Sequence, residues 1–175
     1  MYGKCGDLVK ASHVFCGLLG RDVIAWMVIL SVYAEQGQAE DALALFRIMQ
    51  EEGVRPDDQV LVVMLQACSS MLESDSVETF KVLEIGRALY EDGKRMGYDD
   101  NVYIGSALVT LYGKCGAIEE AEKIFIQLSF RDIILWNTML TMYVDQNEGE
   151  RALRLYRQIY TEGMVPDECT VVVAL

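Results

Sequence analysis

Apolar residues recur along this chain at the spacing of a helix face, in short runs that end at glycine or proline. The clearest run is Trp26, Ile29, Leu30 and Tyr33. A second run follows Gln36-Gly37: Ala42, Leu45, Phe46 and Met49. Gly53 and Pro56 cannot continue that second helix. The two apolar runs and the turn between them therefore predict one helix–turn–helix unit over residues 23–57.

The unit is repeated later in the chain. The pentapeptide YGKCG occupies Tyr2–Gly6 and again Tyr112–Gly116. Further identities follow at the same offset: Phe15/Phe125, Trp26/Trp136, Tyr33/Tyr143, Ala42/Ala152, Leu45/Leu155 and Pro56/Pro166. An internal repeat of this kind usually determines the architecture of the whole chain.

The repeated segments differ in length. They are residues 1–22, 23–57, 58–101, 102–132, 133–167 and 168–175. The segment 58–101 is the longest, because a polar and acidic stretch near residues 72–84 is inserted into it. We expect this stretch to be an extended turn with one helical turn near Val77–Leu83, followed by a helix around Ile85–Gly93. Since one helix pair cannot bury its own apolar face, pairs must stack on their neighbours. The sequence predicts a single all-α repeat array, a solenoid, over residues 1–175.

The composition agrees with a folded helical protein. Hydrophobic residues make up 52% of the chain. The longest apolar run, Val23–Leu30, is too short to span a bilayer, so we expect no membrane partner. The chain opens without the leader of a secreted protein, and five cysteines without paired spacing favour a reducing compartment. The net charge of −12 disfavours nucleic-acid binding driven by charge alone.

The sequence contains no pattern typical of an active site. The lysine of YGKCG lacks the spacing of a phosphate-binding loop, and the Cys-x-x-Cys signature of zinc deaminases is absent. Cys5 and Cys115 hold equivalent positions, where close helix packing explains a small side chain better than metal binding does. We expect His13 at the surface. The sequence predicts no enzyme, no metal site, no cofactor and no small-molecule substrate.

Several of these motifs resemble those of the pentatricopeptide repeat family. They are Gly-x-x-Pro-Asp at Gly53–Asp57 and Gly163–Asp167, Arg-Asp at residues 21–22 and 131–132, the helix starts Asp22–Trp26 and Asp132–Asn137, and YGKCG. The unequal lengths are similar to the plant-type subclass that alternates motifs: short (partial, 1–22), standard (23–57), long (58–101), short (102–132), standard (133–167) and long (start, 168–175). The resemblance implies an all-α, right-handed superhelical solenoid of about ten helices, whose first helices line a concave groove.

The family resemblance implies that the chain binds single-stranded RNA, one base per repeat. In the family, the fifth and last residues of a motif read the base, and an apolar second residue lies between bases. These roles fall on Met27, Asp57 and Ile24 in the first standard motif, on Ser106, Asp132 and Tyr103 in the short motif, and on Asn137, Asp167 and Ile134 in the second standard motif. A basic thirteenth residue near the phosphates corresponds to Lys4 and Lys114. By the family's code Asn137 with Asp167 favours uracil, whereas Ser106 with Asp132 favours a purine and Met27 discriminates poorly.

Other interpretations of the same residues remain open. The closing aspartates precede apolar helices, so helix N-capping alone would explain them, and capping and base contact are compatible. Glu35 and Asp145 replace the basic thirteenth residue, which favours a protein–protein interaction scaffold built on the same repeats. A third alternative is an enzyme whose catalytic domain lies beyond Leu175. The resemblance implies RNA processing or C-to-U editing in a mitochondrion or plastid, with an RNA-editing or processing protein as a partner that supplies the activity.

Overall fold

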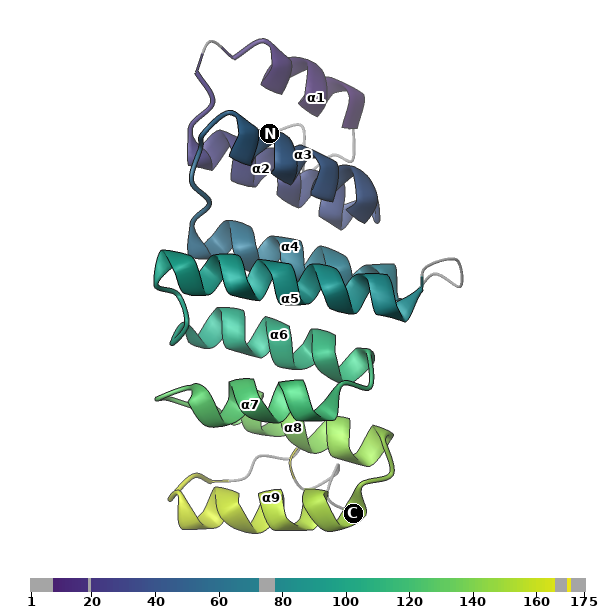
Figure 1. Ribbon diagram of the computed structural model, residues 1–175, viewed down its shortest axis with the longest axis vertical. Coiled ribbons are helices and arrows are strands. Elements are labelled where there is room, and N and C mark those ends of the chain that lie inside the picture. The colour runs from purple at the N-terminus through teal and green to yellow at the C-terminus, as the bar shows by residue number, and fades with distance from the viewer. Residues whose placement is uncertain (1–7, 19, 73–77, 166–169, 171–175) are drawn as a thin grey trace. The chain divides into compact units, whose positions relative to one another are not determined.

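The described residues of the computed structural model are 8–18, 20–72, 78–165 and 170, and they form nine α-helices and no strand (Figure 1). The prediction of an all-α chain is confirmed for these residues. The chain divides into two compact units, Met1–Gly93 and Lys94–Leu175. Each unit is a set of helical hairpins.

The described part of the first unit contains the helices α1 (Leu8–Cys16), α2 (Val23–Glu35), α3 (Ala39–Glu51), α4 (Asp58–Met71) and α5 (Thr79–Met96). The last three residues of α5 belong to the second unit. The first helices of two successive hairpins, α2 and α4, contact each other directly, and α3 packs against both. Helix α1 packs on α2 from the preceding hairpin. The first helices α2 and α4 therefore lie side by side, and α3 packs across both of them.

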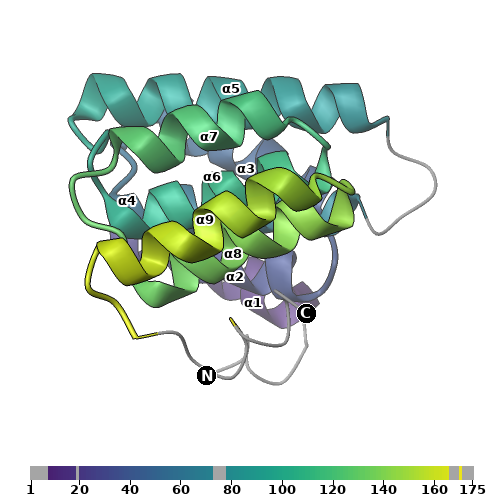
Figure 2. The ribbon, with the colours of Figure 1, turned by 90° about the horizontal axis from the view of Figure 1, so that it is seen from below.

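The second unit repeats this arrangement. Its helices are α6 (Val102–Lys114), α7 (Ile118–Gln127), α8 (Ile133–Asp145) and α9 (Gly149–Thr161). Helices α6 and α8 lie side by side, α7 packs against both, and α9 packs on α8 (Figures 1 and 2). Each first helix thus has one neighbour of its own kind, as the stacking argument predicts.

The predicted apolar faces form the core of each unit. Trp26 is fully buried and Trp136 is 1% exposed. Each tryptophan meets a phenylalanine of the preceding second helix edge to face, at 4.7 Å between ring centroids: Phe15 with Trp26, and Phe125 with Trp136. Edge-to-face aromatic pairs add stabilisation beyond the burial of their area. The aromatic residues that recur in the sequence therefore join one hairpin to the next.

The pentapeptide at Tyr112–Gly116 ends the first helix of the short hairpin. Tyr112 is 2% exposed. Gly113 gives room to Met142 of α8, whose Cγ would lie 3.1 Å from a Cβ added there. Gly116 has φ 71°, a left-handed conformation that glycine adopts at helix ends without steric cost. Gly113 is therefore a place where this helix closely approaches α8.

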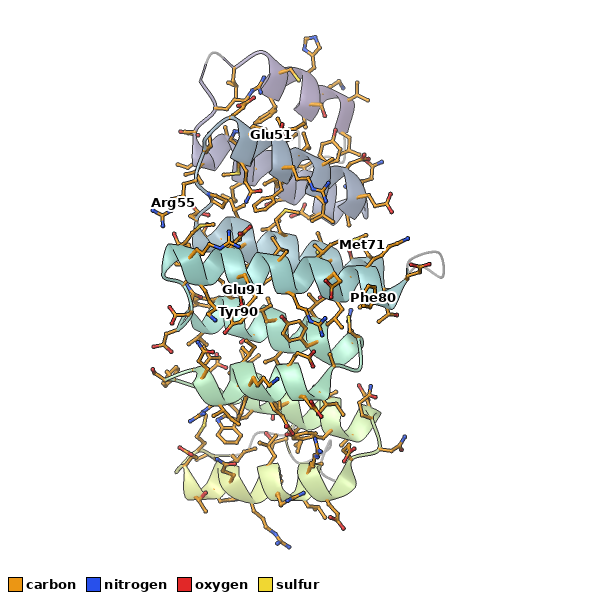
Figure 3. The ribbon with its side chains drawn as sticks, in the orientation of Figure 1. Glu51, Arg55, Met71, Phe80, Tyr90 and Glu91 are labelled. Carbon is orange, nitrogen blue, oxygen red and sulfur yellow. The ribbon has the colours of Figure 1, made fainter. Side chains whose placement is uncertain are left out.

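The inserted stretch of the long segment is shorter than the sequence predicted. Helix α5 begins at Thr79, so residues 79–84 belong to a helix, and residues 73–77 lie outside the described residues. Its buried face is Val82, Gly86, Leu89 and Gly93. Because two of these four are glycines, the helical stripe is weak in the sequence. Met71 and Phe80 lie at the same end of the α4–α5 hairpin, where Phe80 is 68% exposed (Figure 3).

Candidate nucleic-acid interface

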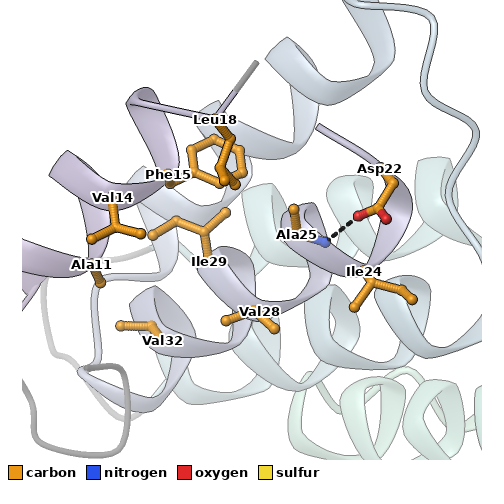
Figure 4. Close-up of a pocket in the computed structure, with 10 residues that line it drawn as sticks. All are labelled: Ala11, Val14, Phe15, Leu18, Asp22, Ile24, Ala25, Val28, Ile29 and Val32. Atoms are coloured by element: carbon orange, nitrogen blue, oxygen red, sulfur yellow. Dashed lines mark hydrogen bonds between the residues drawn. The ribbon is translucent and has the colours of Figure 1, made fainter. Parts of the chain in front are cut away.

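The closing residues of the segments are helix N-caps. Asp57 Oδ1 accepts a hydrogen bond from the Val60 amide at 2.9 Å, and Asp132 Oδ1 accepts one from the Leu135 amide at 2.8 Å. Asp22 caps α2 in the same way (Figure 4). The capping interpretation is confirmed for these three residues. Capping occupies one carboxylate oxygen, so it leaves the second oxygen chemically available to a ligand.

The second residue of each helix, proposed to lie between bases, projects from the surface. Ile24 is 63% exposed, Tyr103 is 75% exposed and Ile134 is 66% exposed. By contrast, the third residue faces the core: Val60, Ile104 and Leu135 are at most 3% exposed. The helix starts therefore hold large apolar side chains in solvent next to a buried face, where a stacked base could cover them.

The fifth residues lie one helical turn after these apolar side chains. Met27, Ser106 and Asn137 are each half-buried. Because residues three apart share a helix face, each fifth residue is adjacent to the exposed second residue of its own helix. Among the described residues no hydrogen bond joins Met27 to Asp57 or Ser106 to Asp132. Each remains a candidate reader by position rather than by direct pairing.

Asn137 has a partner that the sequence did not predict. Thr170 Oγ1 donates a hydrogen bond to Asn137 Oδ1 at 2.7 Å, and Thr170 is fully buried. Asp167, the predicted partner of Asn137, lies outside the described residues. The sequence did contain a signal, because Thr170 stands where the preceding copy has Val60.

A polar stripe runs along the first helices of the second unit from the fifth residue to the thirteenth. It consists of Ser106, Thr110 and Lys114 on α6, and of Asn137, Thr141 and Asp145 on α8. Lys114 and Asp145 are both exposed, so the far end of the stripe is basic on α6 and acidic on α8. A phosphate would be attracted at the first of these positions and repelled at the second. Lys4 lies outside the described residues.

A hydrogen-bonded cluster joins α7, α8 and α9 in the second unit. Tyr143 Oη donates to Glu122 Oε1 at 2.6 Å, and Arg151 Nη1 lies 3.1 Å from the same oxygen. Burial, and then the hydrogen bond to Glu122, raise the pKa of Tyr143 above its ordinary value of 10.0. The equivalent tyrosine of the first unit, Tyr33, instead pairs with the Ser12 hydroxyl at 2.9 Å. This cluster therefore links the α6–α7 hairpin to the α8–α9 hairpin.

An apolar groove of about 310 Å³ lies between α1 and α2 in the first unit (Figure 4). Val14 and Leu18 line it and are 51% and 42% exposed. Their counterparts in the second unit, Ile124 and Leu128, are 5% and 2% exposed. In the second unit, α6 contacts both α7 and α8, the helices that flank these two side chains. The groove thus has the lining of a helix-packing surface rather than of a ligand site.

The described residues meet the requirements of neither a metal site nor a membrane-spanning helix. No three His, Cys, Asp or Glu side chains converge into a possible metal site in the part of the chain that the structure describes. No helix within the same residues is long and apolar enough to cross a membrane.

Comparison with known families identifies the repeats. The model of the PPR repeat family matches residues 21–70, and the PPR repeat model matches residues 106–133 and 134–164. These matches cover most of the chain. The chain belongs to the pentatricopeptide repeat family.

Three curated relatives from Arabidopsis thaliana match over nearly the whole chain. Pentatricopeptide repeat-containing protein At2g33680 is 35% identical over 98% of the chain and 22% of its own length. Its chloroplastic relative At4g25270 is 35% identical over 98% of the chain and 31% of its own length. The mitochondrial relative At1g56690 is 32% identical over 89% of the chain and 21% of its own length. The chain therefore spans less than a third of the length of these relatives.

A solved structure of the same family has the same fold. The pentatricopeptide repeat protein PPR10, in complex with an 18-nt psaJ RNA element, aligns with a TM-score of 0.78 and 21% identity. The alignment covers 98% of this chain and 25% of PPR10. The predicted fold class, an all-α solenoid of helix–turn–helix repeats, is confirmed.

Proposed function

We propose that the chain binds single-stranded RNA, with successive hairpins contacting successive nucleotides. The proposal is supported by the exposed second residues Ile24, Tyr103 and Ile134, each beside a half-buried fifth residue at the start of a first helix. Side chains of this kind can stack on bases of any identity, and the fifth residue can then contact the base edge. The RNA complex formed by the related PPR10 supports the same ligand class.

The second unit carries the most informative pair of readers. Asn137 offers an amide with both a donor and an acceptor, whereas Ser106 offers a hydroxyl. We propose that Asn137 with Asp167 selects uracil, and that Ser106 with Asp132 selects a purine. Met27 with Asp57 discriminates poorly, because a thioether makes only weak hydrogen bonds. This proposal includes the alternation of short, standard and long motifs. The motifs are residues 1–22, 23–57, 58–101, 102–132, 133–167 and 168–175.

The cellular role follows from the relatives. The name of At4g25270 places it in the chloroplast and that of At1g56690 in the mitochondrion, so we propose RNA processing or editing in one of these organelles. The chain supplies recognition and no catalysis, and a partner protein acts on the bound RNA. A protein–protein scaffold is the second candidate, favoured by the exposed Glu35 and Asp145 and by the net charge of −12.

Selection from a random RNA pool tests the proposal. We would use the 175-residue chain at low salt, since phosphate binding weakens as salt rises. The Asn137→Thr variant should change the enriched base at one position of the selected sequences. Gln158→Thr, which alters an exposed amide on α9, should leave the enriched sequences as they are in the wild type.

Two results would separate the candidate functions. Enrichment of a motif that responds to Asn137→Thr alone supports base reading. If no sequence is enriched, or if Asn137→Thr and Gln158→Thr behave alike, the chain is not a base reader at this residue and the scaffold becomes the better account.

A further inference from the structure

Thr170 is a buried polar residue at a position that otherwise holds aliphatic side chains. It is fully buried, and Ser69 is the other buried polar residue in the part of the chain that the structure describes. Thr170 is the third residue of its segment, where Val60, Ile104 and Leu135 pack into the core of the earlier segments. A buried hydroxyl is unfavourable unless it forms a hydrogen bond, and valine would fill the same volume without that requirement.

The hydroxyl of Thr170 bonds to a candidate base-reading residue. Its Oγ1 donates to Asn137 Oδ1 at 2.7 Å. In the preceding standard segment the fifth residue is Met27, and the residue equivalent to Thr170 is Val60. In the first standard segment, an apolar fifth residue is therefore matched by an aliphatic third residue in the following segment. In the second, an amide at the fifth position is matched by a hydroxyl at that third position.

This hydrogen bond ties the Asn137 side chain to the core through Thr170. An asparagine side chain carries an acceptor oxygen and a donor amino group in one plane. Because Thr170 is buried, the hydrogen bond to its hydroxyl restricts the rotamers that the Asn137 side chain can adopt, and the amide is therefore held in one place at the helix start.

We propose that Thr170 is a positioning residue for base selection by the second standard motif. It holds the Asn137 side chain in a fixed position at the start of α8, so that the amide meets the nucleotide in one geometry. The inference rests on the proposed RNA binding, and it adds a specificity-determining residue that belongs to the following segment.

Isosteric variants of the full chain test this role. Thr170→Val keeps the shape and removes the hydroxyl, whereas Thr170→Ser keeps the hydroxyl. Competition between RNA oligonucleotides that differ at the base responding to Asn137→Thr should show about a fivefold loss of discrimination in Thr170→Val, the size expected for one hydrogen bond. Thr170→Ser should retain most of the discrimination. Thr138→Val, which removes a hydroxyl bonded to Ile134 one residue from Asn137, should retain it fully.

A measurement without RNA tests the contact itself. In a double-mutant cycle, Asn137→Ala and Thr170→Val should be coupled by about fivefold in the unfolding equilibrium constant. Absence of coupling would overturn the inference whatever the RNA experiment shows. Coupling with unchanged discrimination in Thr170→Val would also overturn it, and would leave RNA binding intact. If Asn137 and Thr170 are coupled but the wild type does not bind RNA, the proposed function is overturned, and so is the role of Thr170 in base selection.

Discussion

Replacement of Gly105 by alanine tests how closely α6 approaches the end of α7. A Cβ added at Gly105 would lie 2.5 Å from Cδ1, 3.1 Å from Cδ2 and 3.2 Å from Cγ of Leu128. Rotation about the Cβ–Cγ bond would move Cδ1 and Cδ2 but would leave Cγ 3.2 Å from the new methyl group. Leu128 is also 2% exposed, so the surrounding core restricts larger movements of its side chain. Either the leucine must change its rotamer within this core or the helices must separate.

Two opposing contributions determine the size of the effect. Alanine in a helix interior is favoured over glycine by about 1 kcal/mol. Overpacking a well-packed core costs about 1–3 kcal/mol. Since the nearest contact is well below van der Waals distance, we expect the upper part of that range and a net loss of about 1–2 kcal/mol. For a chain of this length, the melting temperature should fall by about 2–8 °C.

Gly93→Ala provides the matched control. Gly93 lies in α5, and its added Cβ would be 3.5 Å from Leu61 Cδ1, an ordinary contact. We expect this variant to be as stable as the wild type or up to about 1 kcal/mol more stable. Thermal unfolding followed by circular dichroism compares the two. If Gly105→Ala is as stable as Gly93→Ala, the close approach of α6 to Leu128 is wrong.

Asp132→Ala removes the cap of α8 and should lower the free energy of unfolding by about 1 kcal/mol. Asp132→Asn keeps a hydrogen-bond acceptor and should lower it by less. Equal losses for the two variants in urea denaturation would contradict the capping role. Tyr103→Ala should change stability by less than about 0.5 kcal/mol, because the side chain is 75% exposed, yet reduce RNA affinity by about fivefold or more. Its control is Ile126→Ala, 73% exposed on α7, and equal losses of affinity would argue against stacking. Burial and Glu122 raise the pKa of Tyr143 in the folded chain above its ordinary value of 10.0. Above about pH 10 the unfolded chain therefore loses the phenolic proton more readily than the folded chain does, and the free energy of unfolding falls; below that pH this contribution to stability is fully present. Unfolding free energy should therefore fall more steeply above pH 10 in the wild type than in Tyr143→Phe, and parallel curves would contradict this.

The sequence predicted the hairpins because their apolar stripes are strong. Ile29, Leu30 and Met139 recur at helical spacing and are at most 3% exposed. The positions of the turns were equally clear. At one of them Asn147 replaces Gly37, and both adopt the left-handed conformation, with φ 59° and 73°. Local patterns of this kind specify elements without any knowledge of distant contacts.

The sequence was a poorer guide to α5 and to the contacts between segments. Gly86 and Gly93 are buried on α5, but glycine contributes nothing to an apolar pattern, so the start of the helix was predicted too late. The contact of Thr170 with Asn137 joins different segments, and periodicity within one helix cannot show such a contact. The choice of base readers came from family resemblance, and their roles remain proposals.

The most direct test of the proposed RNA recognition compares two exchanges in successive hairpins. RNA selection would be carried out with the wild type, with Asn137→Ser and with Ser106→Asn. If each hairpin contacts one nucleotide, each variant should change the enriched base at a single position, and the two positions should be adjacent in the selected RNA. Changes at the same position, at positions separated by more than one nucleotide, or at none would contradict recognition of one nucleotide by one hairpin.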